Sequence, residues 1–273
     1  MVASSEVTKT NAALYEKKDH VAWITLNRPE QMNAKNADLV TGVARGMRAA
    51  STDDDVYVAV LIGAGGKAFC AGMDLKERNQ RNQQNLSPDT RDIGDDFKTY
   101  DCTKPVIAAI DGYAVAGGLQ LASECDIRIA TEKSQFGQPE PRWALNAVSS
   151  INTPERFMPL GEVMNILLTG SRITAQRAYD IGYIQFLVKN RDALIAKVEE
   201  VTGEIKKCAP MAVQLIKKSL RLWMDAPVVN GETALGYAQQ QTAADRKRNA
   251  QSEDAKLGPK AFAEKRTPQW TMR

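Results

Sequence analysis

The chain has 273 residues, of which 43% are hydrophobic and 25% are charged, and its formal net charge is +3. This composition is typical of a globular protein with one large domain, or one domain and a helical extension. The small net charge, spread over interspersed residues of both signs, indicates neither a nucleic-acid partner nor a membrane surface. No apolar run approaches the ~18 to 20 residues that span a bilayer, and the polar N-terminus has no signal core, so we expect a cytoplasmic protein.

Two scarce residue types limit the chemistry. The single histidine, His20, lies in a predicted hairpin turn, so a Ser-His-Asp triad has no evident base and a multi-histidine metal site is excluded. The four cysteines show no paired or metal-like spacing and are expected to be reduced thiols, mostly in the core. We therefore predict no metal site, and acid–base chemistry must fall to Glu, Asp, Lys, Tyr or Cys.

In chain order, apolar runs predict buried strands at residues 21–26, 57–62, 105–110 and 126–130. Helical spacing is found at residues 33–50 and, after about residue 154, at 163–168, 175–181, 191–208, 211–224 and 232–247. The polar residues 77–95 indicate a mobile loop or short exposed helix, a candidate lid over a pocket. Strands that alternate with helices predict an α/β fold with a parallel sheet, followed by a helical C-terminal part.

Two glycine-bearing turns follow the second and third predicted strands. Gly117 and Gly118 lie where a helix is expected to start, and its first amides have no internal partner and carry partial positive charge. Gly72 lies in the earlier turn. Glycines let a ligand approach bare backbone, and neighbouring turns can direct two amides at one developing oxyanion. Alternatively, both are only strand-to-helix turns required for packing.

Several ordered segments resemble the crotonase superfamily, that is, the enoyl-CoA hydratases and isomerases. They are residues 27–34 (NRPEQMNA), 68–75 (AFCAGMDL), 116–118 (AGG), 125–127 (CDI), 136–140 (FGQPE) and 168–170 (LTG), and the terminal segment 258–266 (GPKAFAEKR) is also similar. The resemblance implies a spiral of ββα units. It also implies an N-terminal tail (1–14), a spiral core (15–205) and a helical trimerisation region (206–273).

The resemblance further implies an acyl-CoA thioester as the substrate. Coenzyme A is then part of the substrate and no separate cofactor is expected, in an enzyme of fatty acid metabolism that forms a homotrimer or homohexamer. By motif position, the backbone amides of Met73 and Gly117 form an oxyanion hole for the thioester carbonyl. Contacts to CoA are implied for a larger set of residues, with the last two reaching from a neighbouring subunit: Arg28, Ala34, Lys67, Ala68, Ala71, Asp74, Leu75, Phe262 and Lys265.

The acid–base residues depart from the hydratase pattern. Many hydratases hold a water between two glutamates, one just after the glycine turn and one at the end of the FGQPE segment. Here the first position is Gln120, which can position water but cannot exchange a proton at neutral pH. The second is Glu140, which we expect to be the principal acid or base. Glu124, one helical turn after Gln120, is interpreted as a packing or surface residue.

These departures leave several activities open. Hydration is the family default, but Glu140 alone also supports isomerisation or a hydratase-lyase reaction, which residues 72–77 (GMDLKE) resemble. Residues 145–150 (LNAVSS) replace the glycine-rich helix start of hydratases, so Trp143 and Asn146 are candidates to recognise a polar, cyclic or aromatic acyl group, or the helix is simply repacked. Two alternatives do not involve catalysis. The protein could bind acyl-CoA without converting it, as a catalytically silent binder, or it could bind RNA through its basic segments.

Overall fold

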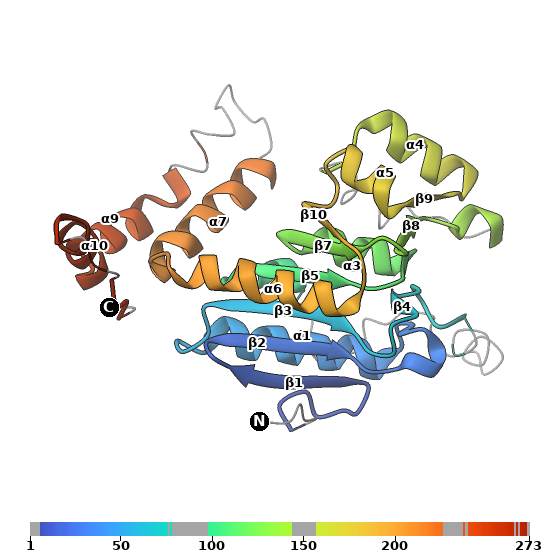
Figure 1. Cartoon of the computed structure of the whole chain (residues 1–273), viewed down its shortest axis with the longest axis horizontal. Coiled ribbons are helices and arrows are strands. Elements are labelled where there is room, and N and C mark those ends of the chain that lie inside the picture. The colour runs from blue at the N-terminus through green and yellow to red at the C-terminus, as the bar shows by residue number, and fades with distance from the viewer. Residues whose placement is uncertain are drawn as a thin grey trace.

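The computed structural model describes residues 6–75, 77, 98–143, 157–225, 237, 240–264, 266 and 268–271. Its largest element is a six-stranded sheet in the order β1-β2-β3-β5-β7-β10 (Figure 1). β1 pairs antiparallel with β2, and each further neighbour in this sheet is parallel. The strands are β1 (Ala13–Lys18), β2 (Val21–Leu26), β3 (Val58–Gly63), β5 (Val106–Ile110), β7 (Ile127–Thr131) and β10 (Phe186–Val188).

A second, smaller sheet has the order β4-β6-β8-β9. β4 (Ala68–Cys70), β6 (Tyr113–Val115) and β8 (Gln135–Gly137) are parallel, and β9 (Arg172–Thr174) is antiparallel to β8. Three successive strand pairs, β3/β4, β5/β6 and β7/β8, each give one strand to each sheet. This is the predicted spiral, and it brings the carboxyl ends of β4, β6 and β8 to one edge.

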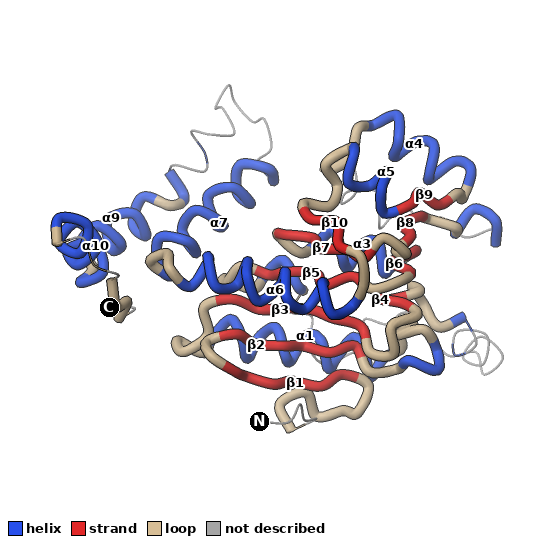
Figure 2. Tube along the Cα trace, viewed as in Figure 1, coloured by secondary structure: helices blue, strands red, loops and turns tan. Residues whose placement is uncertain are grey.

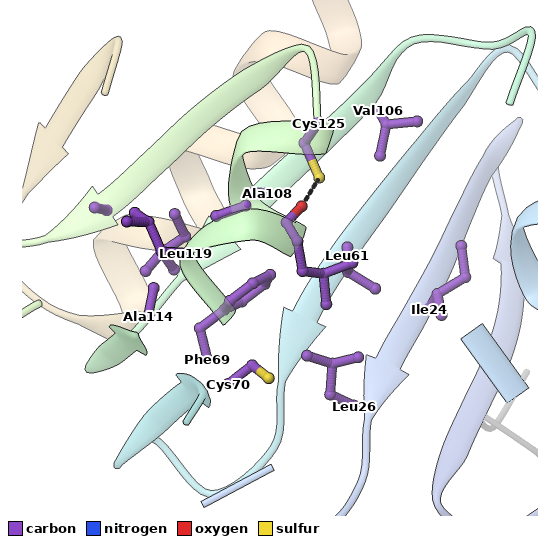
Figure 3. Close-up of a cluster of buried hydrophobic side chains, with 14 of the residues drawn as sticks. Ile24, Leu26, Leu61, Phe69, Cys70, Val106, Ala108, Ala114, Leu119 and Cys125 are labelled. Carbon is purple, nitrogen blue, oxygen red and sulfur yellow. Dashed lines mark hydrogen bonds between the residues drawn. The ribbon is translucent and has the colours of Figure 1, made fainter. Parts of the chain in front are cut away.

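Helices cover both faces of the large sheet. Apolar side chains of α6 (Arg191–Lys206), namely Leu194, Val198 and Val201, pack on one face. α1 (Ala37–Thr52) and α3 (Gly117–Glu124) pack on the other, together with the small sheet. Figure 3 shows this second core, where side chains of β2, β3 and β5 meet Phe69 of β4 and Leu119 of α3.

The remaining helices lie at the two ends of the molecule, as Figure 2 shows. α4 (Leu160–Thr169) and α5 (Ala175–Asp180) lie beside the small sheet, whereas α7 (Pro210–Asp225), α9 (Ala243–Gln251) and α10 (Glu253–Ala263) extend at the opposite end. Asp126, just before β7, ties α7 to the sheet: its carboxylate lies 2.7 Å from Lys217 Nζ and 2.7 Å from Arg221 Nη2. Among the described helices, none is both long enough and apolar enough to cross a membrane.

The predicted strands agree with β2, β3, β5 and β7 to within one residue at each end. The helix predicted from residue 33 begins instead at Ala37, because Met32 and Asn33 have positive φ (52° and 54°) and Asn36 caps the helix by accepting from Leu39 N at 3.0 Å. The strands of the small sheet have only three residues each, too few for a periodic signal, and were not predicted. Residues 144–156 and 78–95, and residues 232–236, 238 and 239 of the helix expected at 232–247, lie outside the described residues.

Candidate active site

Three turns meet at the carboxyl edge of the small sheet. Met73 lies three residues after β4, Gly117 two residues after β6, and Glu140 three residues after β8. The strands are in parallel register, with Cys70 opposite Ala114 and Val115 opposite Gly137. Because parallel strands end at the same edge, segments far apart in the sequence are brought to one place.

The turns at Gly72 and Gly117 are in direct contact. A Cβ added at Gly72, whose φ is +89°, would lie 3.2 Å from Gly117 N and 2.5 Å from Ala116 Cβ. Ala116 itself has a φ of 54°, a conformation that costs energy for a residue with a side chain. A Cβ added at Gly118 would overlap Cys70 O. Gly72 and Gly118 are therefore required because other backbone segments approach them closely. The strained backbone at Ala116 lies next to the predicted oxyanion hole.

The local backbone fixes the direction of the amides of Met73 and Gly117. Gly117 is the first residue of α3, so its N–H has no acceptor within the helix, and the helix dipole adds positive charge there. Met73 forms a parallel bridge with Lys35 that uses Gly72 O and Asp74 N, at 2.6 and 3.0 Å from the main chain of Lys35. This pairing directs the Met73 amide to the other side of its backbone from Lys35. Met73 as a whole is 41% exposed.

Glu140 opens a short 3-10 helix, η4 (Glu140–Trp143), and its carboxylate is partly buried. Burial raises the pKa of this carboxyl, while its own backbone amide and Lys35 lower it by less. Gln138 is fully buried beside it. With the Gln138 amide oriented so that both groups are satisfied, its nitrogen lies 2.9 and 3.0 Å from the two Glu140 oxygens. The amide thus holds the carboxylate in place.

α3 carries the other two candidate acid–base residues. Gln120 lies one turn after Gly117 and is partly buried. Glu124 is the last residue of α3, and burial raises the pKa of its carboxyl against the opposing effects of Lys35, Lys98 and Arg221.

Only some of the residues expected to contact CoA lie together in the structure. Arg28 joins two of them, because Nη1 donates to Ala34 O at 2.5 Å and Nη2 lies 2.9 Å from Asp74 Oδ2. Ala71 N donates to Met32 O at 3.1 Å, next to this cluster. Of the other expected contacts, Lys67 and Leu75 are exposed and Ala68 is buried. Lys265, Asn146, and the side chains of Phe262 and Trp143 lie outside the described residues.

Two residues at this edge were not singled out from the sequence, Lys35 and Gln138. Gln138 lies inside the FGQPE segment, where its position two residues before Glu140 was a usable signal. Lys35 directly follows the NRPEQMNA segment, and its charge beside that motif was the only feature of the sequence that could have indicated a role in the site. The contact of its side chain with Gly117, which is 82 positions later in the chain, depends on the β4–β6 pairing and is visible only in the fold.

Comparisons with known proteins identify the family to which the chain belongs. The chain matches the enoyl-CoA hydratase/isomerase family over residues 16–273. It is 35% identical over 254 residues to the (E)-benzylidenesuccinyl-CoA hydratase of Thauera aromatica, covering 93% of this chain and 96% of that protein. It is also 35% identical over 269 residues to the enoyl-CoA hydratase EchA19 of Mycobacterium tuberculosis, covering 96% and 97% of the two chains.

The solved structures give the same result for the fold. An enoyl-CoA hydratase from Bacillus anthracis has a TM-score of 0.83 to this chain at 29% identity, covering 96% of this chain and 100% of that one. One from Mycobacterium tuberculosis has a TM-score of 0.80 at 32% identity, covering 96% and 100%. The chain therefore belongs to the enoyl-CoA hydratase/isomerase family of the crotonase superfamily, and is an acyl-CoA enzyme of that family.

Proposed function

We propose that this enzyme binds an acyl-CoA thioester, holds its carbonyl oxygen between the amides of Met73 and Gly117, and uses Glu140 to move a proton at the adjacent carbons. The observation that carries the proposal is the contact between the Gly72 and Gly117 turns, beside a carboxylate whose pKa is raised by burial. Two fixed donors make a thioester enolate less basic, and the loss of one such donor typically costs ~3 to 4 kcal/mol. A carboxyl with a raised pKa suits proton transfer near neutral pH.

Hydration is the reaction that we place first. Both relatives compared above carry the name hydratase. In this reaction Glu140 activates water for addition across the α,β double bond, while Gln120 orients that water without exchanging a proton. The rival is isomerisation or a hydratase-lyase reaction, and the specific observation in its favour is Gln120, since a single carboxylate suffices to take a proton and return it elsewhere.

The acyl group that we propose is polar, cyclic or aromatic. One relative is named for benzylidenesuccinyl-CoA, a thioester with an aromatic acyl group, so such thioesters belong beside straight-chain ones in any test. No separate cofactor enters the proposal, because the reactive thioester is supplied by the CoA substrate. We propose that Arg28, Ala34, Lys67, Ala68, Ala71, Asp74 and Leu75 line the CoA path, and that the enzyme works in the cytoplasm.

Turnover of a panel of aliphatic, cyclic and aromatic acyl-CoA thioesters tests the proposal, with mass spectrometry to separate a gain of water from an isobaric product. We expect the wild type to convert at least one thioester, and Glu140→Gln to lower that rate by about 10²-fold or more. Gln120→Glu restores the two-carboxylate arrangement and is expected to raise hydration relative to isomerisation. Gln176→Glu, on the exposed surface of α5, is the matched control and leaves the rate unchanged.

The outcomes separate the candidates. A water adduct that depends on Glu140 supports hydration, and an isobaric product that depends on Glu140 supports isomerisation. If CoA esters bind but neither product forms, the silent binder is the better account. Turnover that survives Glu140→Gln rejects Glu140 as the acid or base.

A further inference from the structure

Lys35 brings a positive charge to the two turns of the predicted oxyanion hole. Its main chain is fixed there by hydrogen bonds to Gly72 O and from Asp74 N, at 2.6 and 3.0 Å. Its side chain runs over Gly117, since a Cβ added at Gly117 would lie 2.8 Å from Lys35 Cε and 2.9 Å from Lys35 Nζ. The backbone bridge between Lys35 and Met73 thus places the Lys35 ammonium group beside Gly117, the first residue of α3.

Nothing in the described part of the chain holds this ammonium elsewhere. Within those residues, no hydrogen bond or ion pair joins Lys35 Nζ to another side chain or carbonyl. Other lysines are engaged, such as Lys217 with Asp126 at 2.7 Å and Lys17 with Asp53 at 2.9 Å. A partly buried cation without a partner has lost part of its hydration, and an anion that forms beside it restores a favourable interaction.

The charge of Lys35 acts on the groups around the hole. It lowers the pKa of Glu140 on η4, of Glu124 on α3 and of Cys70 on β4, in each case against the larger effect of burial. These three elements surround the edge where Met73 and Gly117 lie. The ammonium is therefore close enough to interact with both the proposed base and the proposed oxyanion.

We propose that Lys35 is a third, charged donor to the thioester oxygen, which stabilises the enolate together with the amides of Met73 and Gly117. This inference rests on the proposed function. When the Glu140 carboxylate takes the α-proton, the electron pair of the C–H bond forms a C–C double bond and the carbonyl π pair moves onto oxygen. Glu140 becomes neutral and the oxygen negative, so the ammonium faces the charge that develops. A lysine side chain has enough rotatable bonds to move from Gly117 onto that oxygen.

The same residue explains how the site works with Gln120. Gln120 is uncharged where many hydratases have a glutamate, and Lys35 brings one positive charge to Gly117, three residues before Gln120. With one negative charge fewer and one positive charge nearby, the site stabilises the negatively charged enolate more than the neutral thioester. Catalysis requires this stronger stabilisation of the enolate. This arrangement does not require a second carboxylate.

The exchange of α-hydrogens tests the inference without assuming a product. Butyryl-CoA and 3-phenylpropionyl-CoA are incubated in D₂O with wild type, Lys35→Met, Lys35→Arg and Lys197→Met, and deuterium uptake is followed by mass spectrometry. We expect Lys35→Met to slow exchange by about 10²-fold, as for loss of one oxyanion donor, and Lys35→Arg to retain most of it. Lys197→Met, on α6 across the large sheet, removes a charge away from the site and leaves exchange unchanged.

A second readout depends on binding alone. Crotonyl-CoA labelled with ¹³C at the carbonyl is bound to Glu140→Gln, with and without Lys35→Met, and its carbon resonance is recorded by NMR. We expect the resonance to move back toward that of free crotonyl-CoA when Lys35 is replaced. Without the ammonium, the polarisation of the bound carbonyl is closer to that of crotonyl-CoA free in water. A packing role for Lys35 would leave this resonance unchanged.

The outcomes are distinguishable. Unchanged exchange and an unchanged resonance in Lys35→Met overturn the inference. A loss confined to the affinity for succinyl-CoA, with an unchanged resonance, also overturns it and makes Lys35 a receptor for an acyl carboxylate. If exchange in the wild type survives Glu140→Gln, Glu140 is not the base and the proposed function fails. In that case, and also if the wild type exchanges no α-hydrogen, the resonance still decides whether Lys35 polarises the carbonyl.

Discussion

The chemistry of Glu140 depends on opposing effects at a single carboxyl group. Burial raises its pKa above the ordinary value of 4.5, and the amide of Gln138, 2.9 and 3.0 Å from its oxygens, favours the charged form. As a base Glu140 must be ionised, so activity is lost as the pH falls through this raised pKa. Gln138→Met removes a donor to the carboxylate, and we expect it to move the acidic limb of the kcat/KM profile to higher pH by about one unit.

The direction of that shift is what separates positioning from simple packing. A structural defect at Gln138 would lower kcat/KM at every pH without moving the limb, and that result would contradict the hydrogen bond to Glu140. Gln185→Met, which removes a side-chain amide that accepts from Arg128 N near the start of β7, outside the site, is the control and keeps the wild-type limb. The sequence motif predicted the place of Glu140, but its pKa depends on burial by distant segments and could not be predicted from the motif.

At the scale of an element, the start of α3 depends on two adjacent glycines for different reasons. A Cβ at Gly118 overlaps the backbone oxygen of Cys70, which cannot move without disturbing β4, so Gly118→Ala is expected to destabilise the protein by about 3 kcal/mol. A Cβ at Gly117 would be crowded by the flexible end of Lys35, at 2.8 and 2.9 Å, and would lie at an ordinary contact distance of 3.7 Å from Gly72 Cα. Gly117→Ala should therefore keep a near-normal Tm but lose activity, because it displaces Lys35 from the hole.

Thermal unfolding and turnover of the two variants check this contrast. Equal stability of Gly117→Ala and Gly118→Ala would mean that the close approach of α3 to β4 is wrong. The sequence predicted a helix start after a small-residue turn, and α3 begins within that turn, at Gly117. It did not predict β6, which separates the glycine pair from the long strand, because three residues carry no usable alternation.

For the whole molecule, the order of the motifs was enough to predict the spiral, although the periodicity alone predicted only a parallel sheet with crossover helices. The second sheet explains the difference. Its strands are too short to recognise singly, and the pairing of β4, β6 and β8 joins chain segments more than 20 residues apart, which only the tertiary fold brings together. The same pairing creates the site, so the motifs predicted which residues matter and the fold shows why Lys35 joins them.

The predicted trimer or hexamer has a physical basis in two apolar stripes at the outer helices. On α4, Leu160, Met164 and Leu168 recur every four residues and are 67%, 47% and 71% exposed. On α7 a spacing of four and then three residues exposes a second set, Ile216 at 60%, Leu220 at 54% and Trp223 at 51%. Large apolar side chains repeated along one helical face are typical of a subunit interface, since burying each contributes about 1.5 to 3 kcal/mol.

Charges placed in these stripes should therefore dissociate the assembly. We expect Met164→Lys/Leu168→Glu, and separately Leu220→Glu/Trp223→Glu, to convert a wild-type particle of three or six chains into smaller species in sedimentation velocity. The α-helical signal in circular dichroism should remain, because these side chains are exposed within the single chain. Glu199→Lys, on the exposed face of α6, changes charge without touching either stripe and keeps the wild-type particle. A monomeric wild type, or stripe variants of unchanged size, would show that these faces serve no subunit contact.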